Sequence, residues 1–136
     1  MQQQLIKVGI RVKFQMFDAR AADERVRAGQ HGPMHETSWG SYSVFDADGI
    51  LWDMLHSSSP FTYYENTELD KLLLEARSIL EDDKRKALYA KAQQIVRDEA
   101  PVIFGWGWHQ LWGVNKGVAW EPDADEIDKF YTAKPA

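Results

Sequence analysis

Cysteine is absent from the 136 residues of this sequence. Its absence excludes thiol catalysis, disulfide bonds and thiolate metal sites, but it does not fix the compartment, because many exported proteins also lack cysteine. Long apolar runs are absent too, and none approaches the roughly 20 residues that a membrane-spanning helix needs. Basic residues are outnumbered, since 16 lysines and arginines face 21 acidic residues and give a net charge of −5. This balance argues against a nucleic-acid partner, which requires clustered basic side chains.

Catalytic motifs are also missing. The sequence has no G-x-S-x-G nucleophile elbow, no H-E-x-x-H zinc motif and no glycine-rich phosphate loop. His31, His35 and Glu36 form an H-x3-H-E pattern that suggests metal binding. Gly32-Pro33, between the histidines, prevents the helix that would place both of them on one face. We therefore predict that the protein is not an enzyme and that it holds neither a metal nor a cofactor.

The first nine residues carry two signals. Residues 1–4 lack the basic region and the apolar stretch of a secretion signal, so no targeting peptide is expected in this chain. Leu5 to Gly9 is typical of the last turn of a helix that ends at a glycine. Most of such a helix would precede this sequence, which predicts that the chain is a fragment of a longer protein.

The length is near the commonest size of one domain, so we predict a single domain over residues 1–136. Residues 10–17 alternate between apolar and polar side chains, which predicts a half-buried strand. Residues 18–29 begin with a capping aspartate and end with a glycine, which predicts a helix. Residues 31–39 are expected to form a second strand, and a long loop rich in aromatic and serine residues follows.

The most regular region runs from residue 66 to residue 100. Asn66 is expected to cap one helix, and a break at residues 81–83 starts a second helix that Pro101 ends. The predicted buried stripes contain Leu69, Leu72, Leu73, Ala76, Ile79 and Leu80 in the first helix and Leu88, Ala92, Ile95 and Val96 in the second. The basic run at residues 84–86 lies at the unfavourable end for the helix dipole, so we expect it to be solvated and to find acidic partners such as Glu81 or Asp82.

An aromatic segment, PVIFGWGWHQLWGV, follows at residues 101–114. Its continuous apolar run at residues 102–104 predicts a central strand that is buried on both faces. One face of this strand would be strongly aromatic, while Gly105 and Gly107 leave the other face bare, which often marks close approach of a ligand or another backbone. The acidic residues 121–136 are expected to form a loosely packed tail.

Residues 63–105 carry a family resemblance. Their sequence, YYENTELDKLLLEARSILEDDKRKALYAKAQQIVRDEAPVIFG, resembles the carboxy-terminal part of the extracytoplasmic solute-binding proteins that serve peptide-type ABC importers, the dipeptide and oligopeptide-binding family. The start of the chain, LIKVGIRVKFQ, is similar to the helix and strand that open the third domain of these proteins. The motifs that carry the resemblance are the helix start at 66–70, EAR at 75–77, KRKALYAKAQQIV at 84–96 and EAPVI at 99–103.

The resemblance implies an α/β fold, with a small mixed β-sheet packed by helices. This domain would be one lobe, the carboxy-terminal one, of a two-lobed fold like that of periplasmic binding proteins. The implied function is capture of a peptide-like or other small polar solute in a cleft between two lobes, followed by delivery to an ABC permease in the membrane. The implied location is periplasmic or extracytoplasmic, and the amino-terminal lobe is missing from this chain.

The resemblance also nominates ligand-binding residues. In the family, the segment after a tryptophan runs along the cleft, which nominates Trp39, Tyr42 and Asp46. By the same resemblance, early residues of the strand after Pro101 face the cleft, which nominates Trp106, Trp108 and His109.

One departure from the family pattern concerns charge. Peptide-binding members typically have an aspartate shortly after this tryptophan, and it pairs with the ammonium group of the ligand. Tyr42 matches that position here, and Asp46 is the first carboxylate available after it. A desolvated ammonium needs a paired anion. We therefore predict that the solute has no free α-ammonium group.

Each nominated residue has an alternative role. The tryptophans, Trp112 included, suit a buried core, because aromatic residues on a strand bury a large area. Asp46 and Asp48 suit the cap of a helix that begins near Gly49. A second class of function also stays open, in which the aromatic face of residues 102–114 docks a protein partner. An isolated lobe would expose aromatic surface, so we predict self-association of this chain.

Overall fold

The computed structural model describes residues 1–40, 45–107 and 109–136. The chain divides into two compact units, Met1–Glu36 and Thr37–Ala136, which we call unit 1 and unit 2 and describe separately. The expected single domain over residues 1–136 stays a prediction. Within the described ranges, none of the helices is both long and apolar enough to cross a membrane.

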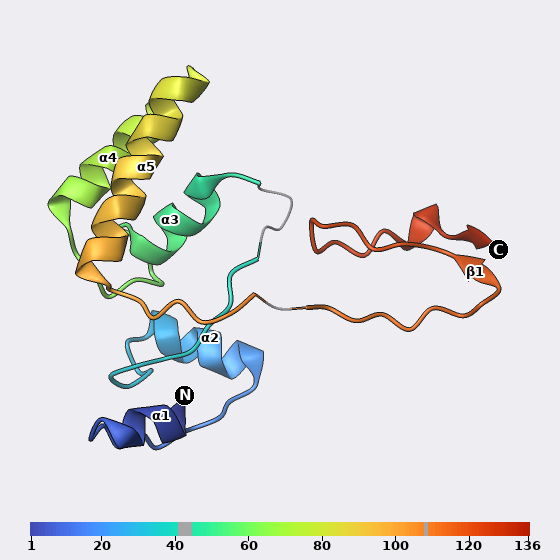
Figure 1. Ribbon diagram of the computed structural model, residues 1–136, viewed down its shortest axis with the longest axis horizontal. Helices are drawn as coiled ribbons and strands as arrows, with labels where there is room; N and C mark the ends of the chain where they lie inside the picture. Colours follow the sequence, from blue (N-terminus) through green and yellow to red (C-terminus); the bar gives the residue numbers. More distant parts are fainter. Residues whose placement is uncertain (41–44, 108) are drawn as a thin grey trace. The chain divides into compact units, whose positions relative to one another are not determined.

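Unit 1 begins with helix α1, at Gln2–Lys7 (Figure 1). The helix ends just before Gly9, whose φ of +84° is a conformation that only glycine adopts without strain. The amide of Ile10 then donates to the carbonyl of Leu5 at 3.0 Å, which pairs a group at the open end of the helix. The predicted helix end at Gly9 is confirmed.

Helix α2, at Ala19–Arg27, follows in unit 1. The carboxylate of Asp18 accepts a hydrogen bond from the amide of Ala21 at 3.0 Å and so caps the first turn. The helix stops before Gly29, which has a φ of +69°. The helix predicted over residues 18–29, with its capping aspartate and closing glycine, is therefore confirmed.

The two strands predicted near the start of the chain are not formed. Residues 10–17 and 31–39 contain no strand, and Phe14 and Met16 are exposed. Alternation of apolar and polar side chains marks the two faces of a strand, but a strand also needs a partner for its backbone hydrogen bonds. None of the described residues supplies that partner, so the alternation leads to the wrong prediction.

Unit 2 is built on three helices, α3 at Ala47–Leu55, α4 at Thr67–Ser78 and α5 at Asp82–Glu99. Helices α4 and α5 lie side by side, and α3 packs against α4 (Figure 1). Their apolar faces meet in a single core, which removes this area from water and stabilises the unit. The core contains Leu51, Leu55, Leu69, Leu73, Ala76, Tyr89, Ala92 and Val96.

The two helices predicted over residues 66–100 are confirmed, with one error at the end of the first helix. The side-chain oxygen of Asn66 accepts hydrogen bonds from the amides of Glu68 and Leu69, each at 2.9 Å, and so caps α4. Leu80, however, is 95% exposed, which contradicts its predicted burial. Because α4 ends at Ser78, the helical spacing that would place Leu80 on the buried face no longer applies.

The aromatic segment after α5 is not a strand. Helix α5 ends at Glu99, and its C-cap Ala100 has a left-handed φ of +47°. Residues 101–107 and 109–114 contain no strand. Phe104 is 72% exposed, so the prediction of a central strand buried on both faces is wrong. An apolar run forms a central strand only where neighbouring strands pair with it on both sides. No strand pairs with the described residues of this segment, so its apolar side chains stay exposed.

A two-stranded antiparallel sheet lies closer to the end of the chain. Strand β1, at Val118–Ala119, pairs with strand β2, at Lys134–Pro135. The fold thus combines helices with a small sheet, which is compatible with the α/β class. The predicted mixed sheet packed by helices is not found among the described residues. The two short strands are antiparallel, and they do not come from the segments predicted to be strands, at residues 10–17, 31–39 and 101–114.

Residues 121–136 are ordered by a small network of charged groups. The ammonium group of Lys129 lies 2.8 Å from the carboxylate of Asp123 and 2.7 Å from that of Asp125. The hydrogen bonds to Asp123 and then Asp125 raise the pKa of Lys129. The indole N–H of Trp120 donates to the carbonyl of Lys129 at 3.2 Å. Most of this tail is exposed, whereas Asp125 is buried.

Candidate ligand-binding site

Trp39, the first nominated residue, is half-buried beside helix α3. Its indole N–H donates to the carbonyl of Gly49, in the first turn of the helix, at 2.9 Å. Its ring meets Phe61 edge to face, with centroids 5.4 Å apart. Such a pair is typical of structural packing, and the hydrogen bond satisfies the only polar atom of the indole. Trp39 is therefore held in place before any ligand contact.

Asp46 caps helix α3, as one of its two predicted roles requires. The carboxylate accepts a hydrogen bond from the amide of Asp48 at 2.8 Å. Its two oxygens also accept from the guanidinium of Arg85 on α5, one of them at 2.8 Å. This two-point ion pair joins residues that lie far apart in the sequence, and both side chains are about one third exposed or less.

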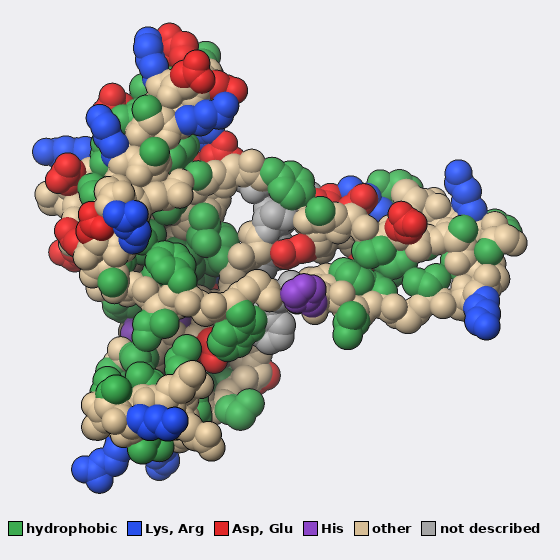
Figure 2. All heavy atoms as spheres, in the orientation of Figure 1, with side chains coloured by type: hydrophobic (Ala, Val, Ile, Leu, Met, Phe, Trp, Pro, Cys, Tyr) green, Lys and Arg blue, Asp and Glu red, His purple; other side chains and the backbone are tan. Residues whose placement is uncertain are grey.

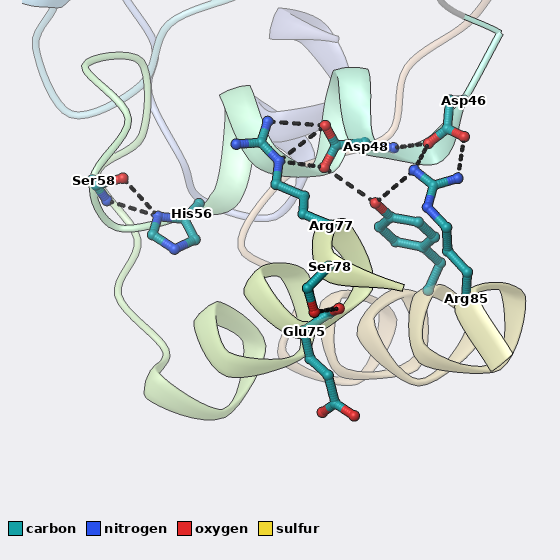
Figure 3. A network of polar contacts seen from close by, with 9 residues as sticks. Asp46, Asp48, His56, Ser58, Glu75, Arg77, Ser78 and Arg85 are labelled. Atoms are coloured by element: carbon teal, nitrogen blue, oxygen red, sulfur yellow. Dashed lines mark hydrogen bonds and ion pairs between the residues drawn. The ribbon is translucent and has the colours of Figure 1, made fainter. Parts of the chain in front are cut away.

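Asp48, two residues after Asp46, connects α3 to helix α4 (Figure 3). The guanidinium of Arg77 donates to its two oxygens at 2.8 and 2.9 Å. The hydroxyl of Tyr89 donates to the same carboxylate at 3.1 Å and accepts from Arg85 at 3.1 Å. We call the five residues Asp46, Asp48, Arg77, Arg85 and Tyr89 the arginine–aspartate network. It ties the start of α3 to both other helices of the core.

Hydrogen bonds, burial and charge shift the pKa values of Asp46, Arg85 and Tyr89 within the arginine–aspartate network. The hydrogen bond from Arg85 holds the pKa of Asp46 below its ordinary value, against an opposing effect of burial. The same hydrogen bond raises the pKa of Arg85. Burial first, and then the carboxylate of Asp48, raise the pKa of Tyr89. At neutral pH Asp46 is therefore an anion that already has a cationic partner in Arg85.

Trp52 of helix α3 contacts two further side chains. The guanidinium of Arg77 lies 3.5 Å from the centre of its ring, and the imidazole of His56 is stacked at 3.8 Å with an interplanar angle of 18°. The Nδ1 atom of His56 accepts a hydrogen bond from the amide of Ser58 at 3.1 Å. These contacts leave Trp52 with a structural role.

Of the four remaining nominated residues, the structure describes Trp106 and His109 but not Tyr42 and Trp108. Trp106 is 61% exposed and His109 is exposed, both in the segment after α5. Figure 2 shows apolar side chains, in green, at the surface of the carboxy-terminal part of the chain. Tyr42 and Trp108 lie outside the described residues, so their nomination stays a prediction. Trp39 and Asp46 each contact the first turn of α3, whereas Trp106 and His109 lie in the segment after α5.

Three residues of the arginine–aspartate network were not predicted. Arg85 was expected to be solvated, with Glu81 or Asp82 as its partner, but it pairs with Asp46. That expectation holds for its neighbours, since Lys84 lies 3.3 Å from Glu81 and Lys86 lies 3.9 Å from Asp82. Arg77 lies in the EAR motif and Tyr89 in the long basic motif, both of which the family resemblance singles out. Membership of these motifs was the only sequence signal that singled out Arg77 and Tyr89.

The histidine pattern of unit 1 does bring two rings together. His31 and His35 have ring centroids 4.7 Å apart. Burial, and next the charge of His31, lower the pKa of His35. Among the described residues, no three histidine, aspartate or glutamate side chains form a group that could hold a metal. The two rings alone do not make a metal site.

Comparisons with known proteins point to peptide binding. No family model and no solved structure matches the chain. The chain is 28% identical over 152 residues to the oligopeptide-binding protein AppA of Bacillus subtilis, which covers 98% of this chain and 26% of that protein. It is 28% identical over 141 residues to the probable D,D-dipeptide-binding periplasmic protein DdpA of Escherichia coli, which covers 96% of this chain and 27% of that protein.

The chain thus spans about a quarter of the length of the curated relatives that it matches. Both relatives are named as binding proteins and not as enzymes, and both names refer to peptides. These similarities support, at a distant level, a relationship between this chain and the peptide-binding proteins.

Proposed function

We propose that this chain is part of an extracytoplasmic solute-binding protein that captures a peptide-like or other small polar solute. The observation that carries the proposal is its similarity to two peptide-binding proteins over almost its whole length. The absence of catalytic motifs from the sequence is in keeping with a binding role. The chain would supply a portion of the carboxy-terminal lobe, and the remaining lobe would complete the cleft.

In this proposal the protein performs no chemistry. The solute binds between two lobes in the periplasm or elsewhere outside the cytoplasmic membrane, and the closed complex delivers it to an ABC permease. Six residues are proposed to contact the solute. They are Trp39, Tyr42, Asp46, Trp106, Trp108 and His109.

The chemistry of the solute follows from the charges near Trp39. The ammonium group of a peptide would need an anionic partner once it is desolvated in a closed cleft. Asp46 already holds the guanidinium of Arg85 at two points, and Tyr42 is a neutral residue at pH 7. An incoming ammonium would have to displace an arginine. We therefore propose a solute without a free α-ammonium, such as a blocked peptide, an opine-like conjugate or a sugar derivative.

Calorimetry on the full protein that contains this chain tests the proposal. Peptides with free amines and the same peptides acetylated at the amine are titrated in parallel, together with amine-free solutes. We expect saturable binding of the amine-free set. Replacement Trp106→Ala should weaken this binding, whereas the control Leu80→Ala, also at an exposed apolar residue, should not change it.

Two results would contradict different parts of the proposal. If no member of either set binds saturably, the solute-binding function itself is wrong. If binding is tight, confined to free amines and abolished by Asp46→Asn, the function stands but the proposed solute chemistry is wrong. Asp46 would then be the anchor of the ammonium group in spite of its pairing with Arg85.

A further inference from the structure

Residues 56–61, which we call the serine turn, join the end of α3 to the chain that leads into α4. His56 directly follows α3, and its Nδ1 atom lies 3.1 Å from the amide nitrogen and 2.8 Å from the hydroxyl oxygen of Ser58 (Figure 3). The amide and the hydroxyl of Ser57 donate to the carboxylate of Asp70, in the first turn of α4, at 3.0 and 2.5 Å. These contacts fix the turn to both helices, and the proposed solute site makes no use of His56.

The contacts of the imidazole determine where its proton lies. A backbone amide can only donate, so Nδ1 must be the acceptor and carries no proton. The hydroxyl of Ser58 therefore also donates to Nδ1, and the proton of the neutral ring lies on Nε2. Nε2 is 3.9 Å from the carboxylate of Asp70. The serine turn is thus built around the neutral form of His56.

Protonation of His56 would place a hydrogen on Nδ1 and end this arrangement. The hydroxyl of Ser58 can rotate and accept that hydrogen, but the amide of Ser58 cannot change from donor to acceptor. Two N–H groups would then face each other across 3.1 Å. The ring is stacked on Trp52 and its side chain is only 13% exposed, so it has little room to turn away. The backbone at Ser58, which is exposed, must move instead.

The charged and titratable groups in the elements around His56 allow the ring to gain a proton in place. They are Asp53 of α3, Asp70 and Arg77 of α4, Tyr64 of the connecting chain and Glu99 at the end of α5. Arg77 is held by Asp48, and the hydroxyl of Tyr64 donates to Glu99. Asp70, at 3.9 Å from Nε2, attracts a positive imidazole. This attraction favours the charged ring but does not restore the hydrogen bond that the amide of Ser58 loses.

The serine turn also contacts Trp39, one of the residues proposed to bind the solute. The amide of Ser59 donates to the carbonyl of His56 at 2.9 Å. The hydroxyl oxygen of Ser59 accepts a hydrogen bond from the amide of Phe61 at 3.2 Å. The ring of Phe61 in turn meets the ring of Trp39 edge to face. A displacement at Ser58 can therefore pass along the turn to the indole of Trp39.

We propose that protonation of His56 displaces the serine turn and weakens solute binding through Trp39. Histidine is the side chain whose charge ordinarily changes between about pH 5 and 8. A protein outside the cytoplasmic membrane meets the pH of its surroundings, so acid would favour release of the solute. We expect the affinity for the solute to fall about two- to tenfold from about pH 7.5 to about pH 5.5, as for the loss of one hydrogen bond. This inference rests on the proposed function, which supplies the solute and the role of Trp39.

Hydrogen exchange on the full protein that contains this chain tests the displacement without any solute. Exchange of the amides of residues 57–61 is measured at about pH 7.5 and about pH 5.5, and each rate is divided by its intrinsic rate at that pH. We expect the protection of these amides to fall about two- to tenfold at the lower pH, while the amides of α4 keep theirs. His56→Asn offers an oxygen close to the position of Nδ1 that does not titrate, so this variant should keep its protection. The control His35→Asn, in unit 1, should behave as the unmodified protein does.

Calorimetry with the N-acetylated peptides of the solute set, at the same two pH values, connects the displacement to binding. The affinity of the unmodified protein should fall at the lower pH, and that of His56→Asn should stay constant. Ser58→Ala removes the hydroxyl and keeps the amide that a protonated ring repels, so its affinity should still fall. Circular dichroism checks that the variants fold.

Three results would overturn the proposal. Equal protection of residues 57–61 at both pH values excludes the displacement, and this measurement needs no variant. A loss of protection that persists in His56→Asn assigns the effect to another group. A loss of protection without any change in affinity separates the serine turn from solute binding. Absence of binding by the N-acetylated peptides at both pH values would contradict the proposed solute instead, and the exchange experiment would still test the displacement.

Discussion

The helical core of unit 2 and the aromatic segment that follows it are both rich in apolar side chains, yet only the core buries them. Leu69 and Leu73 on α4 are fully buried, whereas Phe104 and Leu111 are largely exposed. The difference comes from the backbone. A helix satisfies its own amides and carbonyls, so its apolar face is free to pack against a neighbour. A strand must find a partner for its backbone first, and the described residues offer none to this segment.

The largest expected effect is on the buried side of this comparison. Leu73→Ala removes a fully buried side chain and leaves a cavity in the helical core. We expect the free energy of unfolding to fall by about 2–5 kcal/mol. Urea denaturation followed by circular dichroism measures the loss. The matched control is Leu74→Ala on the exposed side of the same helix, which should change stability little. Equal losses for both variants would mean that α4 is not packed as described.

The arginine–aspartate network should show the next largest effect. Asp46→Ala removes both the cap of α3 and the ion pair with Arg85, and we expect a loss of about 2–3 kcal/mol. Asp46→Asn keeps an oxygen for the cap but removes the charge, so its loss should be smaller, about 1 kcal/mol. Urea denaturation of the two variants separates the two contributions. If asparagine costs as much as alanine, the cap contributes nothing.

Acid should weaken the same network. The hydrogen bond from Arg85 lowers the pKa of Asp46 in the folded protein. Stability from this shift is fully present above the unfolded pKa of aspartate, about 3.9, and is lost as the pH falls through the lower folded value. The urea midpoint of the unmodified chain should therefore fall below pH of about 4 more steeply than that of Asp46→Asn. Parallel curves for the two proteins would show that Asp46 does not titrate with a shifted pKa.

The smallest effect should come from the exposed side of the comparison. Phe104→Ala removes a side chain that is 72% exposed, so we expect the monomer to lose less than about 1 kcal/mol. The measurement is made by urea denaturation at low protein concentration, where association is negligible. A loss of about 3–5 kcal/mol, typical of a buried phenylalanine, would place Phe104 in a core. The contrast between the helical core and this segment would then be wrong.

The sequence predicted the helices well, because their signals are local. A capping side chain such as Asp18 or Asn66 acts on amides two or three residues away, and Gly29 ends its helix within one turn. The strands were predicted wrongly because alternation and apolar runs say nothing about a partner. This is the case for residues 10–17 and 102–104 alike.

The candidate site was predicted only in part. The cap at Asp46 could be inferred from an acidic residue just before a helix, and Trp39 was singled out by the family resemblance. The pairing of Asp46 with Arg85 spans 39 residues, and no local pattern connects the two. Tyr89 was missed because its ring packs in the core while its hydroxyl reaches the polar network, a double role that helical spacing alone does not reveal.

The span of the Asp46–Arg85 pair also has a consequence for the order of folding. Helices α4 and α5 are separated only by residues 79–81, so closing the hairpin between them costs little chain entropy. Docking α3 onto this hairpin must close a much longer loop before Asp46 meets Arg85. We therefore expect the α4–α5 hairpin to form first, so that the network at Asp46 governs how fast the unit opens and not how fast it folds.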